Sequence, residues 1–298
     1  MAHHHHHGNN HHHHDVDNIK VAFFLNLGFT IIEIVGGLYV NSVAIISDAI
    51  HDLGDSLSLG ISWYFQKLSH KGRTPTFSYG YKRFSVLSAI LNSVVLLVGS
   101  VFILMETIPR LIEPEQPDAK GMVALAVLGV IVNGAAVLKT RKGKTANERV
   151  VSLHLLEDVL GWVAVLIGSI VMSLTDFPIL DPILSLMIAG YILFNVFRNL
   201  KNSLRIILQS IPPDVNTKDL ENQLQAIEHV TKVHDMHTWT MDGEYHIMTV
   251  HLVLDKDVDL DTGAAIKAKS RQILKAGEID HVTIELESPN EHCDLEEC

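Results

Sequence analysis

Two apolar stretches of the sequence contain histidine and carboxylate residues at helical spacing. The ionisable residues of the first stretch are Asp48, His51, Asp52 and Asp55, and those of the second are His154, Glu157 and Asp158. Spacings of three and four residues place each set on one face of a helix. Because ionisable side chains inside apolar spans are costly and usually functional, the two faces are candidates for chemistry.

Each stretch contains a His-x-x-x-Asp pair, His51 with Asp55 and His154 with Asp158. Two imidazoles and two carboxylates form the tetrahedral donor set that suits Zn²⁺, whereas Mg²⁺ and Ca²⁺ prefer more oxygens. Two ionised aspartates also offset the charge of a divalent cation. The alternative is a pair of buried polar clusters that only hold helices together. The two matched pairs favour a metal site.

The two pairs are expected at similar depth. His51 and Asp55 lie near the middle of their apolar stretch, and Asp158 follows Arg149 at a helical distance of about 14 Å. We assign three further acids of these faces, Asp48, Asp52 and Glu157, to an ion path. Other polar residues of the apolar stretches are explained equally well by an ion path or by interhelical hydrogen bonds, namely Glu33, Asn92 and Asn133.

Six apolar stretches are long enough to cross a bilayer as helices. They are Ile19–Val40, Val43–Phe65, Phe84–Glu106, Gly121–Leu138, Val150–Leu174 and Pro178–Phe197. Lysine and arginine gather in the second and fourth connections and after the sixth stretch, and they are scarce in the others. This asymmetry predicts a multi-pass protein of the plasma (inner) membrane with both termini in the cytoplasm. It disfavours a soluble bundle of long buried helices.

Composition divides the chain into two parts. The 298 residues carry a formal charge of −11, and residues 212–298 hold 19 of the 34 acids but only 7 of the 23 bases. A near-neutral apolar part and an acidic tail predict two domains in two solvents, and an acidic tail argues against nucleic-acid binding. We expect a histidine-rich arm over 1–18, a transport domain over 19–205 and a cytosolic metal-binding domain over 206–298.

The tail is predicted to be an α+β domain. The expected elements are a helix at Asp219–Glu228 capped by Thr217, strands at Val230–Thr240 and Tyr245–Leu254, a helix at Asp261–Ala276, and a strand at His281–Glu287. The sequence Met241-Asp242-Gly243 indicates a hairpin between the first two strands. The domain also contains many histidines for its size.

Several of these motifs resemble those of the cation diffusion facilitator family, in its zinc-transporting branch. The segments that carry the resemblance are 47–55 (SDAIHDLGD), 154–158 (HLLED), 77–84 (FSYGYKRF) and 181–183 (DPI). The resemblance extends over nearly the whole chain, from about Asn18 to Pro289. Asp52 is not part of the family pattern.

The resemblance implies a fold, an activity and a second metal site. The implied fold is a six-helix transmembrane domain joined to a cytosolic αββαβ ferredoxin-like domain, assembled as a homodimer. The implied activity is export of a divalent metal ion, Zn²⁺ or its relatives Co²⁺ and Cd²⁺, against protons. In the cytosolic domain, His234, His251 and Glu287 match a regulatory zinc site, with His281 near it. Solvent-facing histidines on alternate strand positions are the alternative.

The two ends of the chain also contain metal-binding residue types. His3–His7 and His11–His14 are either a native metal-collecting arm or part of a purification tag. His292, Cys293 and Cys298 are either a terminal metal cluster or an idle tail. The first fourteen residues lack the apolar core of a signal peptide.

Two other function classes fit parts of the sequence. An intramembrane metalloenzyme would need an open metal position and a general base, typically in His-Glu-x-x-His, a motif that is absent here. A metal sensor without transport would leave the ligands inside the apolar spans unused. Binding of metal by neutral histidine and ionised aspartate releases protons, so the predicted ligands themselves favour exchange of metal for protons.

Overall fold

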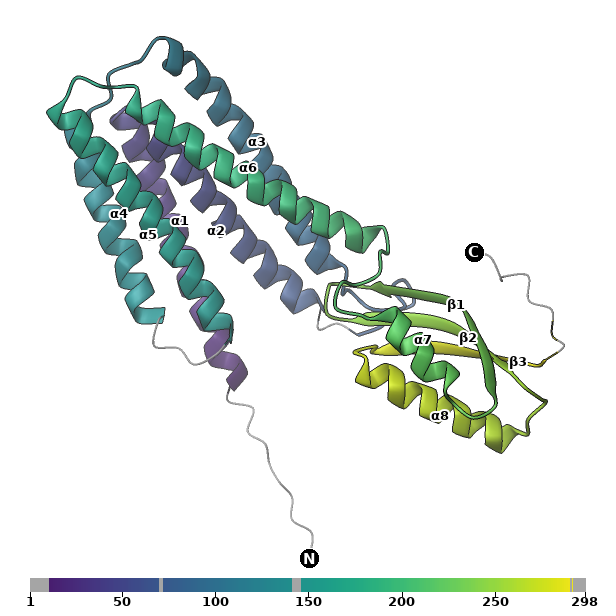
Figure 1. Cartoon of the computed structure of the whole chain (residues 1–298). Coiled ribbons are helices and arrows are strands. Elements are labelled where there is room, and N and C mark those ends of the chain that lie inside the picture. Colours follow the sequence, from purple (N-terminus) through teal and green to yellow (C-terminus); the bar gives the residue numbers. More distant parts are fainter. Residues whose placement is uncertain (1–10, 70–71, 141–145, 290, 292–298) are drawn as a thin grey trace, which may run out of the picture. The chain divides into compact units, whose positions relative to one another are not determined.

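The computed structural model describes residues 11–69, 72–140, 146–289 and 291 (Figure 1). The chain divides into two compact units, a helical unit of residues 1–67 and 88–200 and a sheet unit of residues 68–87 and 201–298. Six long helices of the described residues lie wholly or mainly in the helical unit. They are α1 (His11–Tyr39), α2 (Val43–Ser69), α3 (Phe84–Ile112), α4 (Ala119–Thr140), α5 (Ala146–Leu174) and α6 (Leu180–Ile207).

The surface of the helical unit is apolar. Four helical segments of the described chain are long and apolar enough to cross a membrane, and they are Phe84–Ile112, Ala119–Leu138, Leu156–Leu174 and Leu180–Ile207. Large side chains such as Leu38, Phe102 and Phe194 are each more than 60% exposed. A surface of this kind suits lipid, because helices satisfy their own backbone groups there. α1 adds a shorter apolar segment, Asn26–Tyr39, and the carboxylates of α2 lower its hydropathy.

The helix bounds agree with the sequence predictions at some ends and differ at others. α3 begins at Phe84 and α5 ends at Leu174, as predicted. α1 begins at His11 rather than Ile19, and α6 continues past Phe197 to Ile207. Hydropathy marks where a helix stops being apolar, but charged and polar residues such as arginine and lysine continue a helix readily.

A buried tryptophan forms the centre of the packing between α1, α4 and α5. Trp162 of α5 is 1% exposed, and its ring meets Phe29 of α1 edge to face at a centroid distance of 5.9 Å. On α4, Gly129 lies so close that an added Cβ would be 2.2 Å from the indole ring. The absence of a side chain at Gly129 therefore lets α4 and α5 pack closely.

The start of α2 is held by an aspartate of α6. Asp181 accepts hydrogen bonds from the Ser42 hydroxyl and from the backbone N–H groups of Val43, at 2.8 Å, and Ala44, at 3.3 Å. A carboxylate at a helix N-terminus satisfies free N–H groups and complements the helix dipole. This contact fixes the end of the helix that carries the first His-x-x-x-Asp pair.

The sheet unit contains two helices and three strands in the predicted order αββαβ. The elements are α7 (Thr217–Gln225), β1 (Val230–Thr240), β2 (His246–Leu254), α8 (Leu260–Ala276) and β3 (His281–Glu287). The sheet order is β1-β2-β3, with β1 antiparallel and β3 parallel to β2. α7 and α8 pack against each other, and their apolar residues form one core with the sheet.

The helix caps of the sheet unit differ in part from the sequence prediction. The predicted cap Thr217 is wrong, because Asn216 caps α7 by accepting the N–H of Asp219 at 3.2 Å, and Thr217 is the first helical residue. Asp259 caps α8 by accepting the N–H of Thr262 at 2.8 Å. Hydrogen bonds from Thr262 lower the pKa of Asp259.

Replacement of Gly129 by alanine should destabilise the helical unit. The new methyl group would overlap the Trp162 ring, and overpacking of this kind costs about 1–3 kcal/mol. The measurement is the thermal unfolding midpoint of the detergent-solubilised protein. Gly134→Ala on the same helix is the matched control, because a Cβ there meets no atom within 4 Å. Equal midpoints for the two variants would contradict the packing argument.

Candidate metal centres

The two predicted helix faces meet inside the helical unit. The ligand atoms of His51 and Asp55 on α2 and of Asp158 on α5 all lie within 4.8 Å of one another. The Nε2 atom of His51 is 3.8 Å from Asp55 Oδ2, and Asp158 is 9% exposed. One imidazole and two carboxylates therefore point to a common position, where three protein ligands of zinc are available.

The fourth predicted ligand, His154, lies on α5 one turn before Asp158. Its side chain is outside the described residues. The i, i+4 relation places it on the same helix face as Asp158. The predicted N₂O₂ set thus has three members brought together by the structure, and the position of the fourth on its helix is compatible with the set.

The three acids assigned to the ion path fall into two groups. Asp48 and Asp52 are 5% and 3% exposed inside the helical unit. Glu157 is exposed on α5, and its side chain lies beside that of Tyr191 on α6. Only the two aspartates of α2 are therefore enclosed together with the three ligands.

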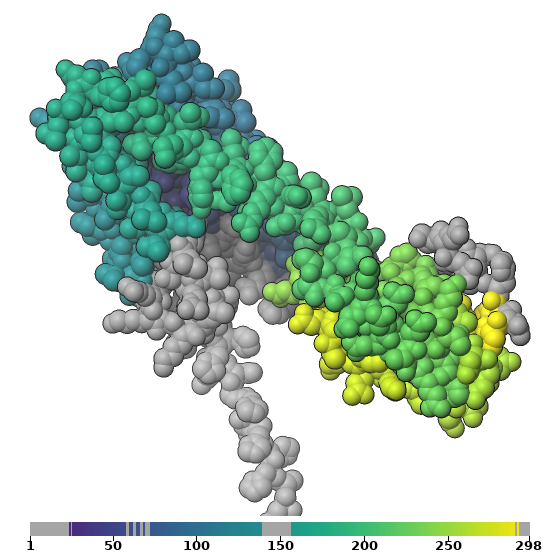
Figure 2. Space-filling model, viewed as in Figure 1, coloured from purple at the N-terminus to yellow at the C-terminus, as the bar shows by residue number. Residues whose placement is uncertain are grey.

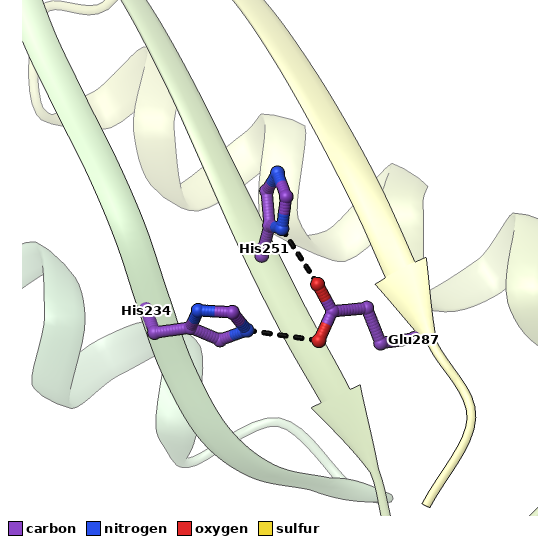
Figure 3. Close-up of side chains that lie close together, drawn as sticks. All are labelled: His234, His251 and Glu287. Carbon is purple, nitrogen blue, oxygen red and sulfur yellow. Dashed lines mark hydrogen bonds and ion pairs between the residues drawn. The ribbon is translucent and has the colours of Figure 1, made fainter. Parts of the chain in front are cut away.

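The sheet unit contains a second cluster, formed by His234, His251 and Glu287 (Figure 3). The Glu287 carboxylate lies between the two rings, 2.8 Å from His234 Nε2 and 2.6 Å from His251 Nδ1. Their side chains are 7%, 11% and 5% exposed, in the order His234, His251, Glu287. The Nδ1 atom of His234 is buried without a hydrogen-bond partner. Imidazole and carboxylate donors at this spacing can hold Zn²⁺ in place of the shared protons.

Strand register explains why these three residues meet. His234 of β1 is directly opposite His251 of β2. β3 runs parallel to β2, with Glu285 opposite His251 and Glu287 opposite Val253. Side chains two residues apart on a strand share a face, so Glu287 lies diagonally beside His251 on the face that holds both rings. His234 and His251 therefore belong to a buried cluster and do not face solvent, contrary to the alternative of solvent-facing histidines on alternate strand positions.

An acidic neighbour of this cluster was missed by sequence reasoning. Asp235 follows His234 in an irregular part of β1, where the register with β2 shifts and the φ of Asp235 is 45°. Its carboxylate is 3.4 Å from His251 Nε2 and 2.7 Å from His237 Nε2. In a regular strand Asp235 would point away from His234. The only available signal was the adjacent polar pair His234-Asp235, which does not reveal a bulge.

His281 does not join the cluster. It begins β3, whereas Glu287 ends it, and a strand rises about 3.3 Å per residue. The His281 ring instead meets Tyr79 edge to face at 5.6 Å. Tyr79 belongs to the α2–α3 connection, which also places Lys82 above the Tyr245 ring at 4.1 Å. This connection is therefore part of the sheet unit.

The predicted terminal sites lie outside the described residues. This applies to His292, Cys293 and Cys298, and to His3–His7. The second histidine run, His11–His14, forms the first turn of α1, but its side chains are not described. The choice between a metal-collecting arm and a tag, and the terminal cluster, stay predictions.

Comparisons with known proteins agree with both units. Residues 19–208 match the family described as "Cation efflux transmembrane domain", and residues 212–289 match "Cation efflux protein, cytoplasmic domain". Both descriptions name a transporter and not an enzyme, so the intramembrane metalloenzyme considered above is excluded.

Three relatives illustrate the similarity. The chain is 29% identical to the "Cadmium, cobalt and zinc/H(+)-K(+) antiporter" of Bacillus subtilis, over 91% of this chain and 88% of the relative. It is 32% identical to the "Metal cation efflux system protein CzcD" of Cupriavidus metallidurans, over 93% and 88%. It is 30% identical to the "Zinc transporter ZitB" of Escherichia coli, over 89% and 85%.

Replacement of Glu287 by glutamine should weaken zinc binding to the sheet unit at least tenfold. The amide keeps the size of the side chain but removes the charge that both imidazoles face. The measurement is calorimetric zinc titration of the full chain in detergent. Glu228→Gln is the matched control, because the Glu228 side chain is 88% exposed. Zinc isotherms that coincide for wild type and Glu287→Gln would show that Glu287 is not a ligand.

Proposed function

The chain belongs to the cation efflux family, and on that premise we propose that it exports Zn²⁺ from the cytoplasm across the plasma membrane. Co²⁺ and Cd²⁺ are further substrates, in keeping with the metals in the name of the Bacillus subtilis relative. The observation that carries the proposal is the convergence of His51, Asp55 and Asp158 within 4.8 Å. Nitrogen and oxygen donors in a buried setting select a borderline cation such as zinc.

The proposed transport site consists of His51, Asp55, His154 and Asp158. Each helix supplies one imidazole and one carboxylate four residues apart, so a zinc ion between α2 and α5 would link the two helices. The two carboxylates neutralise the divalent charge, which lowers the cost of holding it in a setting of low dielectric constant. Relative movement of the two helices would open this tetrahedral arrangement and release the ion.

Protons are the ions that we propose to move in the direction opposite to the metal. Zinc requires neutral histidine and ionised aspartate, so loading releases protons and unloading takes them up. Histidine titrates near neutral pH, which makes His51 and His154 the candidates for groups that alternate between metal and proton. Each charge that crosses the membrane corresponds to about 2.3 kcal/mol per 100 mV. Inward proton movement can therefore drive outward movement of the cation.

The proposed topology has six spans and both termini in the cytoplasm. Four spans are supported by length and composition, and α1 and α2 complete the set, since α2 supplies two of the proposed ligands. We further propose that the αββαβ sheet unit is ferredoxin-like and cytosolic and that the chain forms a homodimer. The match of residues 212–289 to a cytoplasmic domain of this family supports the placement of the sheet unit.

Zinc is also proposed as a regulator at the cluster of His234, His251 and Glu287. Residues 212–298 of two copies carry a formal charge of −12 each, and they should repel at close range. Screening limits this repulsion to about 8 Å at physiological salt. Zinc adds positive charge and fixes the strands of the cluster, so it should draw the two sheet units together and raise transport when cytosolic zinc rises.

Replacement of Asp158 by alanine should abolish zinc transport. The variant loses a ligand and leaves the divalent charge half compensated, so the zinc uptake rate of inside-out proteoliposomes should fall at least a hundredfold. Asp176→Ala is the matched control, because Asp176 is exposed between α5 and α6. Both variants should elute like wild type in size-exclusion chromatography. Wild-type transport by Asp158→Ala would refute the site.

Zinc should shorten the distance between the two sheet units of a dimer. One spin label per copy at Lys218→Cys, an exposed position on α7, reports this distance after Cys293 and Cys298 are replaced by serine. The expected result is a zinc-dependent shortening that disappears in the His234→Ala/His251→Ala double variant. A distance distribution that does not respond to zinc, or responds equally in the double variant, would rule out this regulation.

A further inference from the structure

A third group of carboxylates lies in the helical unit beside the proposed transport site. It consists of Glu33 on α1 and of Asp48 and Asp52 on α2, whose exposed fractions are 1%, 5% and 3%. Both carboxylate oxygens of Glu33 and the Oδ2 atom of Asp48 are buried without a hydrogen-bond partner. Buried polar atoms are normally paired, so these oxygens need an explanation.

The charged neighbours of Glu33 are themselves acidic. Its carboxyl faces Asp52, and Asp48 and Asp158 are close enough to interact electrostatically with it. Asp48 in turn interacts with Asp158 and Asp55. One divalent cation at the transport site offsets two carboxylate charges. Additional positive charge must therefore reach this part of the helical unit for the remaining carboxylates to be ionised.

The group has a defined position along the helices. Glu33 lies about 9 Å before the end of α1 at Tyr39, and Asp48 lies about 8 Å after the start of α2 at Val43. Asp55 is about 18 Å from the same start. Glu33 and Asp48 are therefore level with each other, on the side of the transport site that faces the α1–α2 turn. In the proposed topology this is the side away from the cytoplasm.

Close contacts hold α1 and α2 together in this region. The Asn26 side-chain amide donates to the backbone oxygen of Asp52 at 3.2 Å and to the Ser56 hydroxyl at 3.0 Å. Figure 2 shows a hollow in the helical unit between the teal α5 and the green α6. Purple atoms from the N-terminal part of the chain form the bottom of this hollow. The Asn26 contacts thus hold α1 against α2 about two helical turns before Glu33, whose side chain is enclosed within the unit.

We propose that Glu33, Asp48 and Asp52 form a second, oxygen-only cation position, which the transported divalent ion occupies after it leaves the transport site. The inference rests on the proposed function, since it needs an ion to pass from the His51 site toward the α1–α2 turn. It assigns to Glu33 a direct contact with the ion.

The donor chemistry suits a transit position. Carboxylate oxygens without imidazole bind zinc less selectively than a mixed nitrogen and oxygen set. Unlike His51, Asp55 and Asp158, these three acids do not close into a compact shell in the described structure, so water completes the coordination of the ion. An ion that keeps part of its water leaves readily, and release can then proceed without a second tight site.

The test adds a nitrogen ligand to the proposed position. Glu33→His places an imidazole beside Asp48 and Asp52, which should convert the transit position into a zinc site. Equilibrium dialysis with ⁶⁵Zn²⁺ on the full chain in detergent should then show one more bound zinc per chain than wild type. The matched control is Glu106→His, whose wild-type side chain is 59% exposed on α3, and it should bind no additional zinc.

Transport by Glu33→Gln tests whether the position is used. The maximal rate of zinc uptake in proteoliposomes should fall at least tenfold, with the half-saturating zinc concentration within twofold of wild type, because the transport site is intact. Glu106→Gln serves as the control. Folding of each variant is checked by size-exclusion chromatography, and a Glu33→Asp variant, which keeps the charge, should recover part of the rate.

The outcomes separate this inference from the proposed function. If Asp158→Ala is inactive while a folded Glu33→Gln transports at the wild-type rate, the transport site holds and the second position is refuted. A folded Glu33→His without an additional zinc also refutes it. If Asp158→Ala transports normally, the proposed function itself fails.

Discussion

The constraint on which the helical unit depends is the burial of several carboxylates close to one another. An aspartate at the centre of a membrane-spanning helix costs about 2.5–3.5 kcal/mol on insertion scales, and this unit encloses several of them on α1, α2 and α5. Their electrostatic neighbours are other acids. A cation that enters the unit therefore removes a penalty that the folded chain already carries. Repulsion among these acids lowers the stability of the metal-free arrangement, and the same repulsion raises its affinity for a metal ion.

The comparison between Asp181 and Glu33 shows how the fold separates structural from functional acids. Both are buried in the helical unit, at 2% and 1% exposure. Asp181 accepts hydrogen bonds from Ser42, Val43 and Ala44, so its charge is satisfied by the start of α2 and it has little capacity left for an ion. The oxygens of Glu33 have no donor within hydrogen-bond distance among the described residues, although the Trp162 side chain and Asp52 lie close to them. Asp181 thus holds the start of α2 in place, whereas Glu33 is available to bind a cation at the proposed second position.

The sequence predicts those features that depend on helical or strand periodicity. The spacing of His51, Asp55 and Asp158 predicts two functional helix faces, and matched depth predicts that they meet, as the structure shows. The order αββαβ follows from hydrophobic alternation and turn residues in the same way. Features set by local irregularity or by tertiary contact could not be predicted. Asp235 depends on a bulge, and His281 depends on the docking of Tyr79 from a distant connection.

The two metal centres differ in how firmly their ligands are already held. In the sheet unit, Glu287 bonds to both histidines at 2.6 and 2.8 Å, so the ligands are positioned before metal arrives and zinc must displace protons from an ordered network. In the helical unit, the ligand atoms of His51, Asp55 and Asp158 come from two separate helices and lie within 4.8 Å of one another. An ordered cluster favours slow, selective occupation, which a sensor needs. A looser set that shares its surroundings with further acids favours exchange, which transport needs. In the proposed function, the same residue types thus retain zinc in the sheet unit, where strands hold the ligands, and pass it on in the helical unit, where two helices supply them.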